Sequence, residues 1–195
     1  MSDNFLIGQD ASHHNPCDAI LDNAAFVWLK STEGWTYTDP SLQEKLEHIA
    51  VTRADDLPIM GFYHYARPEN NAAETEVLHY LKVIKPHIGS CLMALDWEGN
   101  SLNMTAKKQS DWINTFCRQV KSRTGVMPFL YISESPLMSI KAYLDTDIPL
   151  WIAKYGSKPA AISKKHPLMW QFTSSPTDLD LWYGTKAQLA SYAIK

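Results

Sequence analysis

Short apolar runs alternate with longer amphipathic stretches along most of the chain. Seven runs consist almost entirely of apolar residues, and they span 5–8, 26–29, 59–65, 92–95, 128–132, 150–153 and 168–172. Near-continuous runs, rather than strict alternation, are typical of strands that are covered on both faces in a parallel sheet. We therefore interpret all seven as buried strands.

Helical patterns separate most of these runs. Asp39, followed by proline, is interpreted as the cap of a first helix with proline at its first position. A second helix starts near 69–71, a third lies between Thr105 and Gly125, and a short fourth is predicted over 135–144. In the last quarter of the chain the strands follow each other closely, which leaves little room for helices.

Alternation of strands and helices predicts a parallel sheet. Seven or eight strands in one domain over 1–195 favour a closed barrel, although the chain is short for a complete eightfold barrel. The expected fold class is α/β, a modified, short (β/α) TIM-like barrel with helices missing in the C-terminal part. An open doubly wound sheet is the alternative, but its usual Gly-rich first turn is not found in "GQDASHH".

Composition excludes several classes of protein. Hydrophobic residues make up 45% and charged residues 20% of the 195 positions, an ordinary globular balance. The formal net charge of −3 gives no basic field for nucleic acid. Three widely spaced cysteines form neither a disulfide framework nor a zinc site and favour a reducing compartment. No signal peptide or membrane-spanning segment is apparent, so we expect cytoplasmic synthesis and no stable membrane insertion.

Polar residues gather where the predicted strands end. In a parallel barrel these ends meet around the active site. Acids follow the first, second and fourth runs and recur near the last strand: Asp10, Glu33, Asp96, Glu98, Asp178 and Asp180. Other polar and aromatic residues at the same level are Lys30, Tyr63, Tyr131, Trp151 and Gln171.

Asp96 and Glu98 form the most informative pair. Residues two apart in a strand face the same side, roughly 7 Å apart at Cα, so Trp97 between them faces away. Two such carboxyl groups suit glycoside hydrolysis, in which one protonates the departing oxygen and the other stabilises positive charge at the anomeric carbon. Crowding and an apolar wall would raise the pKa of the proton donor.

Simpler interpretations stay open. The Asp-x-Glu pair alone also fits the charged end of a strand. Glu33 could serve only to pair with Lys30 or Arg67, and Asp178 could be a turn residue. Clustered carboxylates also bind Ca²⁺ or Mg²⁺, but here they lie on stiff strand ends without an oxygen-rich loop. We expect no metal site and no cofactor.

Seven motifs, in order along almost the whole chain, match one known family. They are "GQDASHHN", "KSTEG", "GFYHYARP", "LDWEGN", "PLWIAKYG", "MWQFTSS" and "TDLDLW". With them the chain resembles the family 25 glycoside hydrolases, the Chalaropsis-type lysozymes of bacteria, fungi and phages. In the last motif Asp180 stands where asparagine is commoner.

The resemblance implies a modified barrel and N-acetylmuramidase activity on peptidoglycan glycan strands. The bond cut would be the β-1,4 link from N-acetylmuramic acid to N-acetylglucosamine, with retention of configuration. Glu98 matches the family's general acid and Asp96 its partner, which would orient the substrate's own N-acetyl group or attack directly. Asp10 and Asp178 match two further acids at the site. The expected sugar-contacting residues are Glu33, Tyr63, Tyr131, Trp151 and Gln171.

For biology, a phage or prophage endolysin is the leading interpretation. Such an enzyme would be monomeric, reach the wall through a holin, and act in the periplasm if the host is Gram-negative. A secreted antibacterial effector muramidase is the nearest alternative. A chitinase-like hydrolase is less favoured because its longer Asp-rich pattern is absent before Asp96. A catalytically inactive peptidoglycan-binding module would be expected to lack a site acid, and all four are present.

Overall fold

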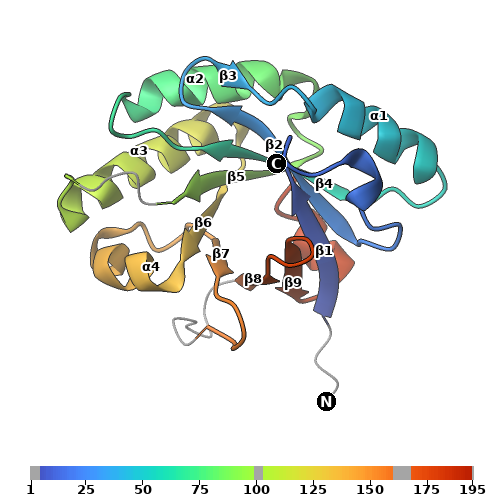
Figure 1. Cartoon of the computed structure of the whole chain (residues 1–195). Coiled ribbons are helices and arrows are strands. Elements are labelled where there is room, and N and C mark those ends of the chain that lie inside the picture. The colour runs from blue at the N-terminus through green and yellow to red at the C-terminus, as the bar shows by residue number, and fades with distance from the viewer. Residues whose placement is uncertain (1–4, 99–102, 160–167, 195) are drawn as a thin grey trace.

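The backbone forms a closed barrel with helices around part of its outside (Figure 1). The computed structural model describes residues 5–98, 103–159 and 168–194. Within these ranges each barrel strand pairs with the next, and the first also pairs with the last. The strands are β1 (Phe5–Ala11), β2 (Phe26–Glu33), β4 (Ile59–Tyr65), β5 (Leu92–Trp97), β6 (Phe129–Ser133), β7 (Leu150–Ala153), β8 (Leu168–Thr173) and β9 (Leu179–Tyr183). A short β3 (Tyr37–Thr38) extends β2.

Strand direction divides the barrel into two parts. The pairs from β1 through β2 and β4 to β8 are parallel. β9 runs antiparallel to both β8 and β1 and closes the barrel. All seven predicted strands are present, and the expected modified barrel is confirmed. β9 was not among the seven runs, because its buried and partly buried residues alternate rather than forming one apolar stretch.

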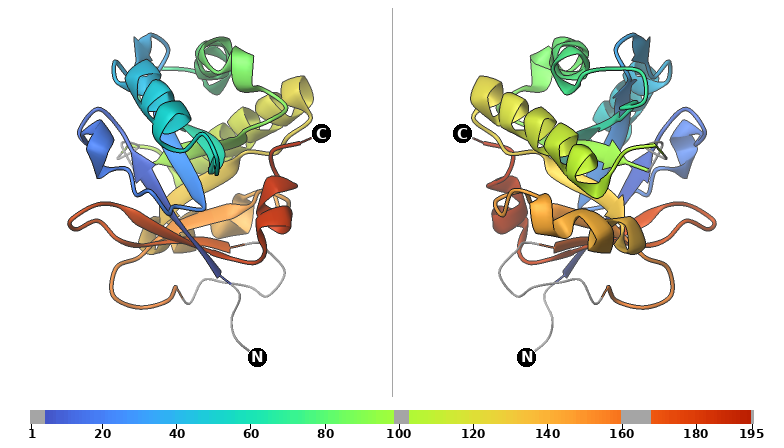
Figure 2. Two further views of the ribbon diagram at one scale, coloured as in Figure 1. Left: turned by 90° about the vertical axis from the view of Figure 1, so that its right-hand side faces the viewer. Right: turned by 90° about the vertical axis from the view of Figure 1, so that its left-hand side faces the viewer.

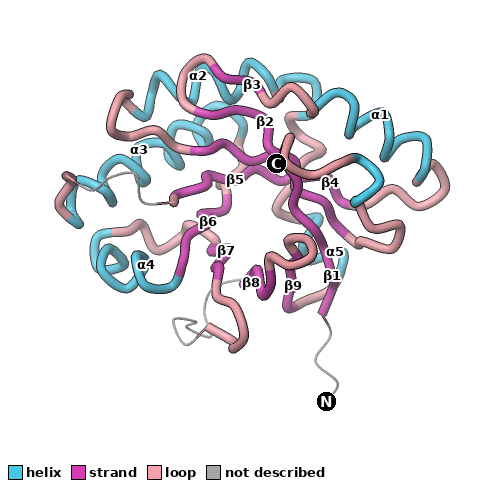
Figure 3. Tube along the Cα trace, viewed as in Figure 1, coloured by secondary structure: helices cyan, strands magenta, loops and turns pink. Residues whose placement is uncertain are grey.

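Helices cover the outside of the parallel part, as two further views show (Figure 2). They are α1 (Leu42–Thr52), α2 (Ala73–Val83), α3 (Ala106–Thr124) and α4 (Glu134–Ile140). Three 3₁₀ turns accompany them: η1 (Cys17–Ala19), η2 (Lys85–His87) and η3 (Lys141–Tyr143). Between β7 and β9 no helix occurs among the described residues, as predicted, and α5 (Lys186–Ala190) follows β9 (Figure 3). None of the described helices combines the length and hydrophobicity that a membrane span needs.

The helix ends follow the sequence signals, with one correction. Thr105 caps α3 by accepting a hydrogen bond from the backbone N–H of Lys108, and Gly125 ends α3 at a φ of 82°. Asp39, predicted as the cap of the first helix, lies two residues before the observed cap, Ser41. Its carboxylate accepts the backbone N–H of Ser41, and α1 begins only at Leu42. Asp39 therefore shapes the turn that leads into the helix.

Apolar side chains form two cores, one on each side of the barrel wall. The outer core lies between strands and helices and includes Trp97 and Phe116. The inner core fills the barrel with large aromatic rings, including Trp28 and Trp151.

One end of the barrel is closed. Leu189 of α5 packs with Phe26 and Phe129, the first residues of β2 and β6. Since α5 thus covers the end at which parallel strands begin, a pocket can form only at the opposite end, where they finish.

Candidate active site

A cavity of about 280 Å³ opens at the carboxyl end of the parallel strands. Four carboxyl groups line it, and they come from three separate parts of the chain. Asp10 is on β1, Asp96 and Glu98 are at the end of β5, and Asp178 lies just before β9. Four of the six acids at the predicted strand ends therefore line this cavity, whereas Glu33 and Asp180 do not.

Asp96 and Glu98 differ in their exposure to solvent. Asp96 is 6% exposed, whereas Glu98 lies at the open rim. Trp97 faces the outer core and packs on Trp112, with ring centroids 5.5 Å apart, as the alternation within the strand predicts. The pair thus places one buried and one accessible carboxyl group on the same wall of the cavity.

Both carboxyl groups hold their proton more firmly than a free side chain does. Burial raises the pKa of Asp96 well above its ordinary value, and the negative charge of Glu98 adds to this. Partial withdrawal from water raises the pKa of Glu98, and Asp178 raises it further. The Lys30 ammonium lowers the pKa of both groups. The pair therefore resists full ionisation, so that one carboxyl group can carry a proton while the other is charged.

Asp10 is held by a chain of amide and hydroxyl groups. Gln171 donates from Nε2 to Oδ2 of Asp10 at 2.7 Å. The amide oxygen of Gln171 in turn accepts from the hydroxyl groups of Tyr131, at 2.9 Å, and Tyr155, at 3.0 Å. Burial, followed by the charge of Asp178, raises the pKa of Asp10 to about 7, although the bond from Gln171 lowers it. Asp10 is therefore fixed in orientation by the amide that donates to it.

Asp178 and Asp180 lie on either side of the first residue of β9. Asp178 belongs to the turn between β8 and β9, is half-buried, and has a pKa raised mainly by that burial. Asp180 is fully buried inside the barrel, where its Oδ1 accepts a hydrogen bond from Nε1 of Trp151 at 2.7 Å. Only Asp178 lines the cavity, and Asp180 lies outside its lining.

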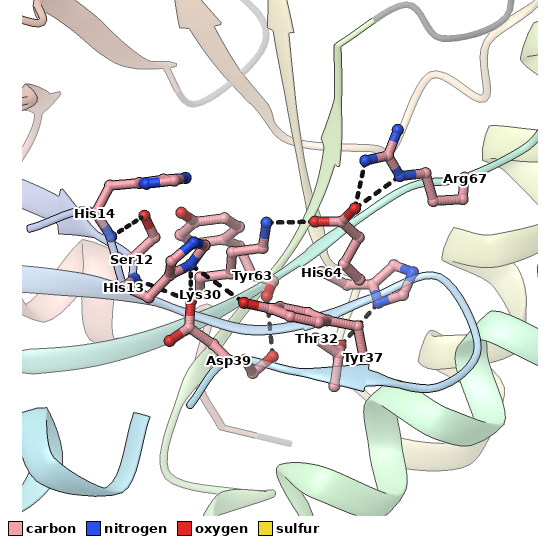
Figure 4. A network of polar contacts seen from close by, with 12 residues as sticks. Ser12, His13, His14, Lys30, Thr32, Tyr37, Asp39, Tyr63, His64 and Arg67 are labelled. Atoms are coloured by element: carbon pink, nitrogen blue, oxygen red, sulfur yellow. Dashed lines mark hydrogen bonds and ion pairs between the residues drawn. The ribbon is translucent and has the colours of Figure 1, made fainter. Parts of the chain in front are cut away.

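An ion chain borders the cavity on the β2 side. Lys30 Nζ lies 2.6 Å from Oε2 of Glu33, and Arg67 Nε donates to the other oxygen at 2.7 Å. In Figure 4 the Lys30 and Arg67 side chains approach this one carboxylate from opposite sides. Both cations also lie over the ring of Tyr65, at 4.7 and 4.9 Å from its centroid. This chain of ion pairs holds the Lys30 ammonium at the cavity, where it lowers the pKa of Asp96 and Glu98.

Glu33 lies differently from the other candidate residues. Its carboxylate is engaged by Lys30 and Arg67, which lowers its pKa despite partial burial. It lines an adjoining hollow with Trp35 and Tyr37 rather than the cavity of the four acids. The contact of Glu33 with sugar stays a prediction. In the structure its carboxylate forms ion pairs with Lys30 and Arg67.

A second polar network lies on the outer side of this region, and Figure 4 shows its Thr32–His64 contact. The hydroxyl of Thr32 lies 2.8 Å from Nδ1 of His64, and Nε2 of His64 lies 2.7 Å from a carboxylate oxygen of Glu76. His64 and Glu76 are fully buried, and burial lowers the pKa of the imidazole. Glu76 also accepts the backbone N–H of Arg67. The network ties α2 to the ends of β2 and β4 and stays away from the cavity.

The remaining residues predicted to contact sugar all line the cavity, but they differ in how far their side chains are exposed and free to bind. Tyr63 and Tyr131 are 8% and 9% exposed. Trp151 is only 2% exposed because its ring stacks on Trp28, with centroids 4.9 Å apart. Gln171 is also 2% exposed, and its amide already bonds protein groups at both ends. Trp151 and Gln171 thus form the floor, on which other groups are positioned.

Several lining residues had no assigned role from the sequence. Lys30, Ser12, Tyr65 and Tyr155 stand at predicted strand ends, so their position was a usable signal. His14 and Asn15 come from the loop after β1, and nothing in the local pattern distinguishes them. Tyr155, 55% exposed, is the most accessible aromatic ring of the cavity.

This arrangement suits acid–base chemistry on an uncharged, polar substrate. The cavity holds several carboxyl groups with raised pKa values, one ammonium group and aromatic rings. Within the described residues, no three His, Cys, Asp or Glu side chains are arranged to hold a metal ion. Paired carboxyl groups of unequal exposure, flanked by aromatic rings at the mouth of a barrel, define the site of a glycoside hydrolase.

Comparison with known proteins gives the particular family. The sequence pattern of glycosyl hydrolases family 25 matches residues 18–181, and the chain belongs to this family. An N,O-diacetylmuramidase from Chalaropsis sp is 28% identical over 183 residues, which cover 84% of this chain and 86% of that protein. An autolytic lysozyme from Clostridium acetobutylicum is 30% identical over 143 residues, 68% of this chain and 39% of that protein.

A solved structure agrees with the fold. A family 25 lysozyme from Aspergillus fumigatus matches with a TM-score of 0.82 at 24% identity, covering 98% of this chain and all of that one. The resemblance seen in the sequence motifs is confirmed, and so is the expectation of a lysozyme-type glycoside hydrolase.

Proposed function

We propose that the protein is an N-acetylmuramidase that cuts the β-1,4 bond between N-acetylmuramic acid and N-acetylglucosamine in peptidoglycan. The observation that carries the proposal is the convergence of Asp10, Asp96, Glu98 and Asp178 on one open cavity. The names of relatives that match most of the chain support the substrate class. The enzyme would act as a monomer.

In this proposal Glu98 acts as general acid and then as general base. It is the accessible carboxyl group, and its raised pKa keeps part of the population protonated as the glycosidic oxygen arrives. After departure of the leaving group, the resulting carboxylate takes the proton from the attacking water. These two roles fit retention of configuration.

Asp96 would assist the substrate's own N-acetyl group. Asp96 lines the cavity and is 6% exposed, so its carboxylate can accept the N–H of an acetamido group bound there. As that group attacks the anomeric carbon, it becomes positively charged, and a neighbouring positive charge favours the ionised form of Asp96. Direct attack by Asp96 is the competing route, and trapping of a glycosyl–enzyme intermediate by mass spectrometry would establish it.

The other residues would position the glycan. Asp10 and Asp178 present acceptors for hydroxyl or amide groups on the far side of the cavity from β5. Tyr63 and Tyr131 would contact the sugar from the walls, with Trp151 and Gln171 beneath them. Glu33 would act at the adjoining hollow, where a longer strand continues.

Identification of the new reducing ends tests the proposed reaction. Purified peptidoglycan is digested, reduced with borohydride and hydrolysed to its sugars. Reduced N-acetylmuramic acid supports the muramidase, whereas reduced N-acetylglucosamine means that the other glycosidic bond is cut. Binding to sacculi without any new ends would favour an inactive peptidoglycan-binding module, and activity on chitin oligomers would favour a chitinase-like hydrolase.

As biological role we propose lysis of a bacterial host as an endolysin. The proposed reaction supplies the wall cleavage that lysis requires, and a holin would give the enzyme access to the wall, in the periplasm of a Gram-negative host. Expression with and without a holin tests this role. Lysis that requires the holin supports it, whereas killing of neighbouring cells without lysis of the producer would favour a secreted antibacterial effector.

A further inference from the structure

Asp180 is a buried acid that the proposed mechanism does not use. It is the second residue of β9 and lies directly opposite Gly8 of β1 and Gln171 of β8. The residue is fully buried and does not line the cavity. Its carboxyl group is thus enclosed by the barrel, directly beneath the layer of acids that faces the substrate.

The two carboxyl oxygens of Asp180 have different surroundings. Oδ1 accepts from Nε1 of Trp151 at 2.7 Å, so this oxygen acts as an acceptor. Oδ2 is buried and meets no donor among the described residues. Asp10 is the diagonal neighbour of Asp180 across the β1–β9 pair, since Asp180 lies opposite Gly8, and each of the two carboxyl groups shifts the pKa of the other as a hydrogen-bond partner. Two ionised carboxylates have no proton to share, so one of the two groups must be protonated.

The neighbours decide which of the two carries the proton. Asp10 accepts a second hydrogen bond, from Gln171 at 2.7 Å, and lies at the cavity. Asp180 has only the indole N–H and no access to water. Because donors and solvent stabilise the ionised form, the charge belongs on Asp10 and the proton on Oδ2 of Asp180.

The other charged and titratable groups around the pair reinforce this assignment. Those that face it across the cavity are Asp178 from the β8–β9 turn, Asp96 and Glu98 from β5, Tyr63 from β4 and Tyr131 from β6, with Lys30 of β2 and His14 of the loop after β1 as basic groups. Acids outnumber basic groups here. A second full negative charge deeper in the barrel would therefore be opposed from several sides.

We propose that Asp180 is a positioning residue, held as a neutral acid whose Oδ2–H donates to Asp10 and fixes that group as an oriented anion. Together with Gln171 it would give Asp10 two donors from below and leave its remaining lone pairs for the substrate. An asparagine side chain offers the same acceptor and donor. The inference rests on the proposed function for the role of Asp10.

The direction of the pKa shift agrees with the geometry. Burial raises the pKa of Asp180 well above its ordinary value, and the charge of Asp10 raises it further. The folded protein thus keeps a proton that the unfolded chain releases above about pH 4. Because the folded-state pKa is raised, stability is lost as pH rises from there through the folded-state pKa. Asp180→Asn removes this loss.

Three variants test the proposal. Asp180→Asn keeps a donor and an acceptor, Asp180→Leu has similar size and neither, and Asp18→Asn changes an exposed acid as the control. Infrared difference spectra at pH 7, wild type minus variant, report the C=O stretch of a protonated carboxyl group. Melting temperatures are measured from pH 4 to pH 8, and kcat and KM for peptidoglycan digestion are determined at the pH optimum.

The expected results separate a proton donor from a simple packing role. The wild-type-minus-Asp180→Asn difference spectrum shows the band of one lost protonated carboxyl group, and the wild-type-minus-Asp18→Asn spectrum shows none. The melting temperature of Asp180→Asn rises relative to wild type as pH increases. Its kcat stays within about threefold, whereas Asp180→Leu loses at least about tenfold in kcat.

Three other results would overturn the inference. They are an unchanged infrared band in Asp180→Asn, a pH-independent difference in melting temperature, or equal losses of kcat in the Asn and Leu variants. The spectra and melting curves need no substrate, so they decide the protonation of Asp180 even if Leu fails to fold. Absence of reduced N-acetylmuramic acid with wild-type protein would instead reject the proposed function.

Discussion

Replacement of Glu98 by glutamine isolates the proton transfer from the rest of the site. The amide has nearly the same shape, and Glu98 lies at the exposed rim, so no buried group loses its packing. General acid–base catalysis typically contributes 10²- to 10⁴-fold to a rate. At about 1.4 kcal/mol per factor of ten, Glu98→Gln should raise the barrier by roughly 3–5 kcal/mol.

The effect on stability should be small and opposite in sign. Burial and the charge of Asp178 raise the pKa of Glu98, which means that the fold disfavours its ionised form. Because the folded-state pKa is raised, the penalty grows as pH increases from about 4 to the folded-state value. The glutamine variant should therefore melt at the wild-type temperature in acid and at the same or a higher temperature at neutral pH.

Turnover is measured as the release of reducing ends from purified sacculi, and folding by thermal melting at pH 5 and pH 7. Glu47→Gln provides a matched control, since Glu47 is an exposed glutamate on α1 that is bonded to Gln43. We expect Glu98→Gln to lose at least a hundredfold in kcat while the control stays near wild type. Lysis at close to the wild-type rate, with unchanged melting, would refute the assignment of Glu98.

Three further variants probe other parts of the structure. Gly61→Ala would place a methyl group 2.2 Å from the ring of Trp28, so we expect a loss of about 1–3 kcal/mol, or more, in urea unfolding; an unchanged midpoint would contradict the packing described. Lys30→Met removes the cation that lowers the pKa of both β5 carboxyl groups, so the alkaline limb of the pH–rate profile should move to higher pH, and a shift to lower pH would oppose the argument. Tyr155→Ala removes an exposed ring and should raise KM about two- to tenfold, whereas Tyr155→Phe should keep most of the affinity, and equal KM values in the two variants would exclude stacking.

The fold was largely predictable because most of its strands are buried on both faces. Such strands appear in sequence as unbroken apolar runs, and all seven runs form strands of the barrel. β9 lacks this signal: it alternates between buried and partly buried residues, and one of the buried ones is Asp180. A polar residue in the interior hides a strand from any method that counts apolar residues.

The site was predictable in its acids and less so in its other residues. Asp10, Asp96 and Glu98 stand at strand ends, which is a property of one strand and visible in sequence. Whether a polar side chain at such an end faces substrate or another side chain depends on its neighbours in space. The amide of Gln171 is engaged in hydrogen bonds within the protein, and the carboxylate of Glu33 is paired with Lys30. No local sequence pattern distinguishes these two side chains from ones that are free to bind substrate.

The reversed direction of β9 explains how the fourth acid reaches the cavity. In the parallel part, the acids at the mouth of the barrel come after the apolar run of their strand, as Asp10 and Glu98 do. β9 is antiparallel to β8 and β1, so its mouth end is its beginning. Asp178, which precedes β9, therefore lies at the same level as the acids that follow parallel strands. Two residues later the chain has already turned into the barrel, and the next acid, Asp180, is buried below. One strand thus supplies both an acid for the cavity and a buried neighbour of Asp10.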